Sequence, residues 1–155
     1  MKVKTPPQQL VITVRSSAFA DKGAIPSKYT CDGRNVNPPL DFAGIPAHAK
    51  SLVLIIDDPH APAGTWLHWL VWNIPVTQHL EENLVPGEQG VNDFGRLAYG
   101  GPCPPSGTHR YYFRVFALDR WLDLEPGSAR QQVEEAMNDH LVGYGELVGL
   151  YKRNR

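Results

Sequence analysis

The chain of 155 residues has a length typical of one domain, because a chain of this size buries roughly 70% of its unfolded surface. Its 15 Lys and Arg residues nearly balance its 16 Asp and Glu residues, and neither sign gathers into a long run, so nucleic acid is not an expected partner. No stretch of about 18 apolar residues occurs, and the apolar run Leu10–Val14 is too short for a signal peptide. We therefore expect a soluble, cytoplasmic protein that does not insert into a membrane.

Two cysteines, Cys31 and Cys103, are too few for a disulfide framework or for a four-ligand zinc site. Because the expected compartment is reducing, the sequence favours two free thiols, with a single bridge between them as the alternative. No linker, internal repeat or low-complexity segment divides the chain. The sequence predicts one domain over residues 1–155.

Apolar runs separated by glycine and proline predict short strands joined by turns. Glycine and proline number 14 each and lie between the apolar runs. The expected strands are, in chain order, Leu10–Val14, Leu40–Phe42, Ser51–Ile56, Trp66–Ile74, His109–Leu118 and Glu146–Tyr151. This pattern favours an all-β protein, an antiparallel β-sandwich.

The strand Trp66–Ile74 is apolar on both of its faces. Strict alternation puts His68 and Trp72 on one face and Trp69 on the other. A strand buried on both sides lies inside its sheet, so His68 has to find a hydrogen-bond partner or open into a pocket.

The strand His109–Leu118 projects His109 and Tyr111 to the same side. It follows a loop of glycines and prolines, YGGPCPPSGT, which allows close backbone approach and can present N–H groups to an anion. By itself, such a loop is most simply a turn between strands.

One helix is expected near the end of the chain. Ser128 and Gln131 have the spacing of a capping box, and Gly143 or Gly145 would end the helix. Residues of one face recur at helical spacing, namely Val133, Ala136, Met137, His140 and Leu141. This stripe predicts a face packed on the sheet, with its histidine half-buried and hydrogen-bonded.

Several stretches resemble the phosphatidylethanolamine-binding protein family, most closely its bacterial and archaeal Raf-kinase-inhibitor-like branch. They are DDPHAP, LHWLVWNIP, YGGPCPPSGTHRYYF, YTCDGRNVNPPLDF, ALD and the terminal HLVGYGELVGLYKR, which together cover nearly the whole chain. The resemblance implies a β-sandwich with Greek-key connections. It also implies a small pocket at one end for phosphate-like anions or phosphorylated head groups.

Carried over by position, the resemblance implies a pocket lined by Asp58, Pro62, His68, Gly101, Pro102, His109 and Tyr111. The family commonly has a cis peptide at the position before Pro62, and proline is the residue for which cis is inexpensive. Two imidazoles, a tyrosine hydroxyl and loop N–H groups suit an anion, while Asp58 would orient an imidazole.

The sequence departs from the family pattern in two places. His60 stands where the family usually has a second aspartate, so we expect it to face the pocket and to strengthen anion binding as the pH falls. The alternative is a solvent-exposed turn position. The chain ends at YKRNR soon after the last strand, so we expect no additional C-terminal helix, a more open pocket, and apolar surface suited to a homodimer.

Two rival functions would use the same side chains. A metal site would use Asp58, His60, His68 and His109. This set suits Zn²⁺ or Fe²⁺, but its spacing matches no strong motif. A hydrolase would use Ser106 or Cys103 as its nucleophile, yet neither lies in a G-x-S-x-G turn. We therefore expect a non-enzymatic binding module without a metal or cofactor, which by the family resemblance regulates a protein partner such as a kinase or protease.

Overall fold

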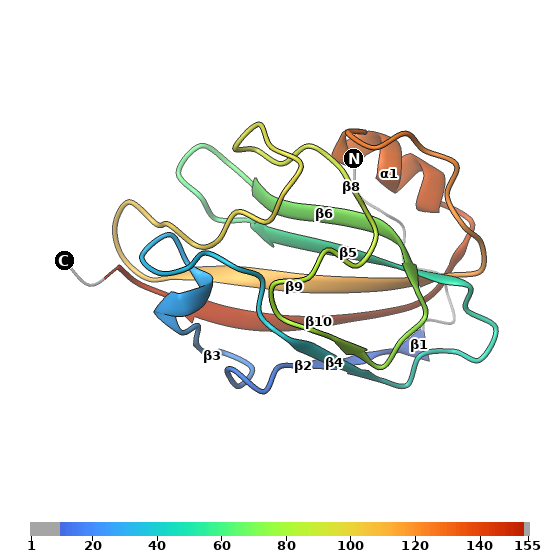
Figure 1. The fold of residues 1–155 in the computed structure, drawn as a ribbon, viewed down its shortest axis with the longest axis horizontal. Helices are drawn as coiled ribbons and strands as arrows, with labels where there is room; N and C mark the ends of the chain where they lie inside the picture. Colours follow the sequence, from blue (N-terminus) through green and yellow to red (C-terminus); the bar gives the residue numbers. More distant parts are fainter. Residues whose placement is uncertain (1–9, 154–155) are drawn as a thin grey trace.

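The computed structural model describes residues 10–153, which form two β-sheets, one α-helix and one 3-10 helix, η1 (Ser27–Tyr29) (Figure 1). The large sheet has seven strands in the order β1-β10-β9-β5-β6-β8, with β3 also paired to β10. Their bounds are β1 (Leu10–Val11), β3 (Gly23–Ala24), β5 (Ser51–Asp58), β6 (Trp66–Pro75), β8 (Glu88–Gln89), β9 (His109–Leu118) and β10 (Leu141–Tyr151). The small sheet has the order β2-β4-β7, made of β2 (Thr13–Arg15), β4 (Leu40–Ala43) and β7 (His79–Leu80).

Buried side chains from both sheets form one apolar core. Leu40 and Phe42 of β4 belong to the same cluster as Leu54 of β5 and Phe113 of β9. The all-β class with one helix is therefore confirmed, while the finer description as a sandwich with Greek-key connections stays a prediction. The short pairings of β1 and β3 with β10 are parallel, in contrast to the antiparallel pairing of the other strands.

The expected strands are present, with changes at both ends of the chain. The run Leu10–Val14 divides at Ile12 between β1 and β2, which belong to different sheets. The last strand begins at Leu141, five residues before the predicted start at Glu146. Strands β3, β7 and β8 are not predicted from the sequence, because two-residue strands are too short to show a period.

The helix α1 (Arg130–Met137) covers the face of the large sheet that is turned away from the small sheet. Val133 and Met137 are fully buried beside Trp72. The capping interaction lies one residue later than predicted, because the backbone N–H of Ala129 donates to the side-chain oxygen of Gln132 at 2.8 Å.

The predicted end of the helix was wrong. The helix stops at Met137, and Asp139 adopts a left-handed φ of 71° before β10 begins. Gly143 and Gly145 lie inside β10, where the backbone of Ile12 approaches so closely that it leaves no room for a Cβ atom at Gly145. These glycines permit close approach of two strands, a use that the sequence does not distinguish from helix termination.

A β-bulge changes which way the start of β6 faces. Ile56 pairs with Trp69 and Asp57 pairs with Leu67, so His68 is the extra residue on β6. Trp69 belongs to the core between the sheets, and the His68 ring contacts Tyr111 of the same core. The predicted placement of His68 and Trp69 on opposite faces was therefore wrong.

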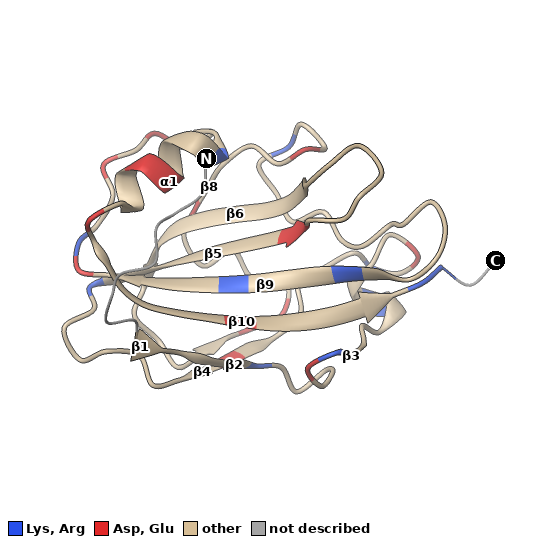
Figure 2. Cartoon of the chain, turned by 180° about the vertical axis from the view of Figure 1, so that it is seen from behind, with Lys and Arg blue, Asp and Glu red and all other residues tan. Residues whose placement is uncertain are grey.

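Buried charges join α1 to the sheet at the end of β5. The Asp57 carboxylate is 1% exposed and lies 3.1 Å from Arg114 Nε and 2.9 Å from Arg130 Nη1. Seen from behind, acidic residues mark the end of β5 and α1, and basic residues lie along β9 (Figure 2). A buried carboxylate needs such partners, so Asp57 fixes the strand end that carries Asp58.

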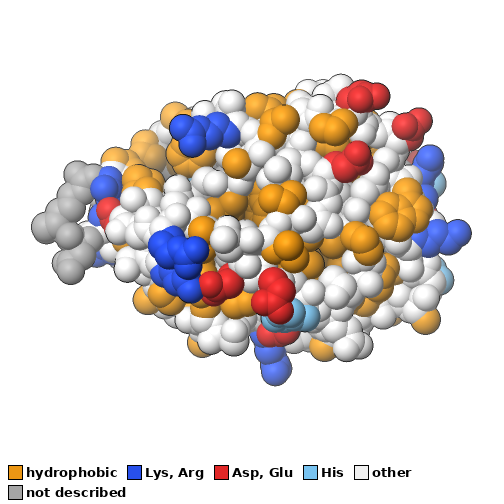
Figure 3. All heavy atoms as spheres, in the orientation of Figure 1, with side chains coloured by type: hydrophobic (Ala, Val, Ile, Leu, Met, Phe, Trp, Pro, Cys, Tyr) orange, Lys and Arg blue, Asp and Glu red, His pale blue; other side chains and the backbone are white. Residues whose placement is uncertain are grey.

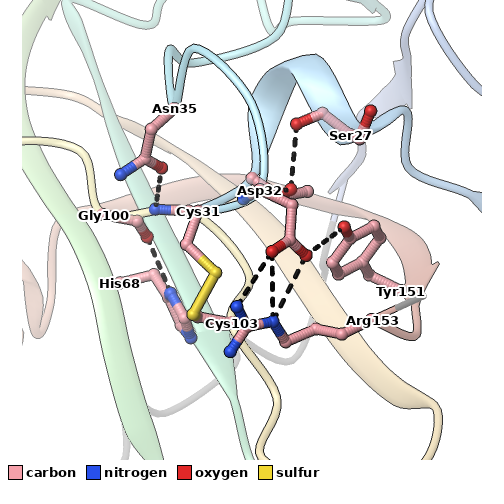
Figure 4. The surroundings of a disulfide bond; sticks show 11 residues. Ser27, Cys31, Asp32, Asn35, His68, Gly100, Cys103, Tyr151 and Arg153 are labelled. Atoms are coloured by element: carbon pink, nitrogen blue, oxygen red, sulfur yellow. Dashed lines mark hydrogen bonds and ion pairs between the residues drawn. A yellow bond between two sulfur atoms is a disulfide. The ribbon is translucent and has the colours of Figure 1, made fainter. Parts of the chain in front are cut away.

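The two cysteines form a disulfide, Cys31–Cys103, with 5.4 Å between their Cα atoms (Figure 4). The expectation of two free thiols was wrong, because the fold brings together residues 72 positions apart at a separation that suits a bridge. Next to it, Asp32 accepts hydrogen bonds from Tyr151 and Arg153. The segment after η1 is thus tied to the loop before β9 and to the end of β10.

We predict that Trp72→Ala lowers the free energy of unfolding by about 3 to 5 kcal/mol, because it opens a large cavity under α1. Trp72→Phe should lose much less, since Trp72 Nε1 is buried without a hydrogen-bond partner among residues 10–153 and the phenyl ring keeps most of the packing. Urea unfolding of both variants measures the difference. Equal losses would show that the indole N–H has a partner.

We predict that replacing both cysteines by serine lowers the free energy of unfolding by about 4 kcal/mol, the amount expected for a loop of this length. The parent protein should show the same loss when a reductant is added, and the double variant should not respond to it. A parent protein that unfolds identically with and without reductant would show that the bridge does not stabilise the fold.

Candidate functional site

A cavity of about 240 Å³ lies where β5 ends and β6 and β9 begin. In Figure 1 this is the end of the large sheet away from α1. Its polar groups are Asp58, His68, His109 and Tyr111. Its apolar walls are Ala61, Pro62, Ala63, Trp66, Phe94, Cys103, Pro104 and Pro105. The cavity therefore has mostly apolar walls and four polar side chains.

Asp58 and His109 form a hydrogen-bonded pair across two neighbouring strands. Asp58 Oδ2 lies 2.6 Å from His109 Nδ1, and the side chains are 3% and 14% exposed. The other carboxylate oxygen accepts the backbone N–H of His60 at 3.0 Å. Because Asp58 can only accept when ionised, Nδ1 donates to it, and Nε2 also faces an acceptor, so Nε2 is the ring nitrogen that can donate to a ligand. Nε2 lies 3.2 Å from the carbonyl oxygen of Ser106, in an exposed loop.

His68 lies deeper in the cavity and has a defined tautomer. Its Nδ1 lies 2.7 Å from the carbonyl oxygen of Gly100, which can only accept, so Nδ1 donates. The side chain packs edge-on against Tyr111 and Phe94, with ring centroids 5.2 and 5.4 Å away. Burial lowers the pKa of His68, against the opposing effects of the Gly100 carbonyl and of Asp58. The neutral ring therefore has a lone pair on Nε2.

Tyr111 supplies a hydroxyl donor beside the two histidines. Its ring is buried and stacks on the His109 ring at a centroid distance of 6.4 Å. Burial raises the pKa of Tyr111, with the nearby Asp58 charge acting in the same direction, so the hydroxyl keeps its proton at neutral pH.

Gly101 and Pro102 do not line the cavity but anchor the loop that does. The Gly101 N–H donates to Asn35 Oδ1 at 2.8 Å, and the Pro102 carbonyl accepts the Cys31 N–H at 3.1 Å. A side chain at position 101 would collide with the backbone of Tyr29, so glycine is required here for close approach. These contacts hold the adjacent Cys103 in the cavity wall.

Pro62 and His60 belong to the exposed turn between β5 and β6. Pro62 lines the cavity, but no cis peptide occurs in residues 10–153, so the expected cis bond was wrong. The trans form is the cheaper one, and an exposed turn exerts no packing force against it. His60 is exposed and lies outside the cavity lining, although its backbone N–H binds Asp58.

Sequence reasoning missed most of the apolar wall. Phe94 lies in the loop between β8 and β9, far from any periodic segment, and touches both Trp66 and His68. Trp66 begins the predicted strand that carries His68, and Pro104 lies in the glycine and proline loop before His109. The only signal for them was their neighbourhood to His68 and Cys103 in the sequence.

The ligand sets of the two rival functions do not assemble. Within the described part of the chain, no group of three or more His, Cys, Asp and Glu side chains is arranged to hold a metal ion. As candidate nucleophiles, Cys103 has no thiol because it is disulfide-bonded, and Ser106 presents its backbone carbonyl to His109. Between residues 10 and 153, no helix has the length and apolar character to cross a membrane.

Comparisons with known proteins agree with the resemblance seen in the sequence. The family model named phosphatidylethanolamine-binding protein matches residues 15–152. A UPF0098 protein of Methanothermobacter thermautotrophicus is 53% identical over 150 residues, covering 92% of this chain and 99% of that protein. A UPF0098 protein of Aquifex aeolicus is 46% identical, with 93% and 90% covered.

Two crystal structures show the same fold. That of CT736, a phosphatidylethanolamine-binding protein homolog from Chlamydia trachomatis, has a TM-score of 0.90 and 40% identity, covering 94% of this chain and 100% of that one. YbcL of E. coli has a TM-score of 0.84 and 28% identity, covering 92% and 99%. The chain therefore belongs to the phosphatidylethanolamine-binding protein family, in its bacterial and archaeal branch.

Proposed function

We propose that the protein is a non-enzymatic binding module whose cavity takes a phosphate-like anion or a phosphorylated head group. The observation that carries this proposal is that both ring nitrogens of His109 face acceptor oxygens, those of Asp58 and Ser106, in a cavity beside the Tyr111 hydroxyl. An anion that takes the place of the Ser106 carbonyl would accept a hydrogen bond from Nε2. Charge-assisted donors of this kind bind oxyanions well. Membership of a family named for binding a phospholipid supports the same ligand class.

The shape of the cavity fits an anion that carries a small substituent. The cavity volume of about 240 Å³ is several times the roughly 30 Å³ that one water occupies in the liquid. The cavity therefore has room for a tetrahedral oxyanion and a small substituent. The polar groups lie together, whereas Trp66, Phe94 and Pro104 offer apolar and aromatic surface for the rest of the ligand. The Ser106 carbonyl is the group that the ligand would displace from His109 Nε2.

Regulation of a protein partner is the second part of the proposal. We propose that the module acts by occupying a partner or by carrying a ligand to it. Inhibition of a kinase or protease rests on the resemblance to the Raf-kinase-inhibitor-like branch. We propose a cytoplasmic location, as expected from the sequence; disulfides such as Cys31–Cys103 are uncommon in that compartment.

We predict that His109→Ala and Tyr111→Phe each weaken phosphate binding by about 1 to 3 kcal/mol, because each removes a donor to a charged ligand. His60→Asp is the matched control: its side chain is exposed outside the cavity, so affinity should change little. Calorimetry measures all three affinities. Parent-like affinity in both pocket variants would place the anion elsewhere, and a large loss in His60→Asp would return His60 to the binding site.

Self-association is expected through exposed apolar side chains of the loop between β8 and β9, which also contributes Phe94 to the cavity. Val91, Phe94 and Leu97 are 36%, 43% and 47% exposed, and hydrophobic side chains gather on this view of the molecule (Figure 3). We predict a dimer in sedimentation that Leu97→Asp weakens. Trp121→Ser is the control, because Trp121 is equally exposed but follows the far end of β9. A parent protein that sediments as a monomer at high concentration would reject the dimer.

A further inference from the structure

For an anion site, the cavity has few hydrogen-bond donors and several acceptors. None of the described residues that line it is Lys or Arg. Both oxygens of the buried Asp58 carboxylate are already acceptors, and His68 Nε2 adds a further lone pair. Donors come from the Tyr111 hydroxyl and from His109, whose Nε2 faces the carbonyl oxygen of Ser106, an acceptor. An anion made only of acceptor atoms would therefore have one side facing a lone pair.

His68 Nε2 is the acceptor in the cavity that a proton-free anion leaves without a donor. Nδ1 is committed to the Gly100 carbonyl, so the ring cannot move its proton to Nε2 without leaving a buried carbonyl unpaired. Nε2 makes no hydrogen bond to any described residue, and the ring is only 4% exposed, within the cavity that it lines. The Nε2 lone pair can therefore accept a hydrogen bond from a ligand.

Charged and polar groups on several neighbouring elements face His68 and affect its pKa. Asp57 and Asp58 on β5 and the carbonyls of Gly100 and Gly101 favour a second proton on the ring. Burial opposes it and outweighs them, so the pKa of His68 lies below its ordinary value. From β9, Tyr111 and His109 face the same space, and Phe94 closes it from the β8–β9 loop without charge.

We infer that the pocket selects anions that carry a proton of their own, such as hydrogen phosphate or a phosphomonoester monoanion, over proton-free anions of the same shape, such as sulfate. This inference rests on the proposed function and names its ligand class. The P–OH group of the ligand would donate to His68 Nε2, while the remaining oxygens accept from Tyr111 and His109.

Sulfate and hydrogen phosphate make a matched pair for this comparison. At about pH 8 both are tetrahedral dianions, and only phosphate keeps a proton. With His68 neutral, sulfate forgoes one charge-assisted hydrogen bond and places an oxygen against a lone pair. We expect sulfate to bind at least about tenfold more weakly than phosphate.

Acidification should remove this preference. A bound sulfate favours the charged form of His68, so its binding takes up a proton and strengthens as the pH falls toward and below the ordinary histidine range of about 6.5. Phosphate needs no such proton and should gain less. The ratio of the two affinities should therefore narrow between about pH 8 and pH 5.5.

The test is calorimetric titration of inorganic phosphate and sodium sulfate into the full-length protein at both pH values. Two buffers of different ionisation enthalpy report the proton uptake directly. In His68→Gln, the amide can either accept or donate, so we expect phosphate and sulfate to bind alike at about pH 8. The control His60→Gln, an exposed residue outside the cavity, should keep the preference of the parent.

The outcomes separate this inference from the proposed function. Equal affinities of the parent protein for phosphate and sulfate at about pH 8 would overturn the proton requirement and leave anion binding intact. Failure of both anions to bind at either pH would overturn anion binding and the inference with it. If His68→Gln does not fold, the two parent titrations still decide, because they need no variant.

Discussion

The end of strand β5 places two neighbouring carboxylates in the protein interior, where side chains of β9 and α1 pair with them. Asp57 turns toward α1 and pairs with Arg114 and Arg130. Asp58 turns toward the cavity and pairs with His109. Because a buried carboxylate without a partner is very costly, the docking of the helix and the geometry of the pocket are both tied to one strand end.

The bulge at His68 converts this strand end into a pocket. Without the extra residue, His68 would alternate away from Tyr111 and the cavity would have an apolar floor. The loop before β9 then completes the site, since its Gly100 carbonyl sets the His68 tautomer and its Cys103 is bridged to Cys31. The polar geometry thus depends on backbone irregularities that rigid elements hold in place.

The sequence predicted the elements better than their orientations. Long apolar runs identified β5, β6 and β9, because burial on both faces leaves a strong signal. Alternation predicted that His109 and Tyr111 share a side, since β9 has no bulge between them. It failed for His68, because one inserted residue reverses the faces and no residue type announces it. The disulfide was equally hidden, as pairing over 72 residues follows from topology.

A buried carboxylate can lie beside an anion site when an imidazole separates the carboxylate from the anion. Asp58 is almost fully covered and His109 is the more exposed member of the pair, so the polarised ring, and not the carboxylate, meets the ligand. His68 lacks such a carboxylate partner, and burial lowers its pKa, so the ring that donates to the Gly100 carbonyl stays uncharged and accepts at Nε2. Two histidines in one cavity therefore play opposite parts, because His109 Nε2 faces the Ser106 carbonyl, whereas His68 Nε2 faces no acceptor that it hydrogen-bonds among residues 10–153. A ligand that satisfies both must accept hydrogen bonds on one side and donate one on the other.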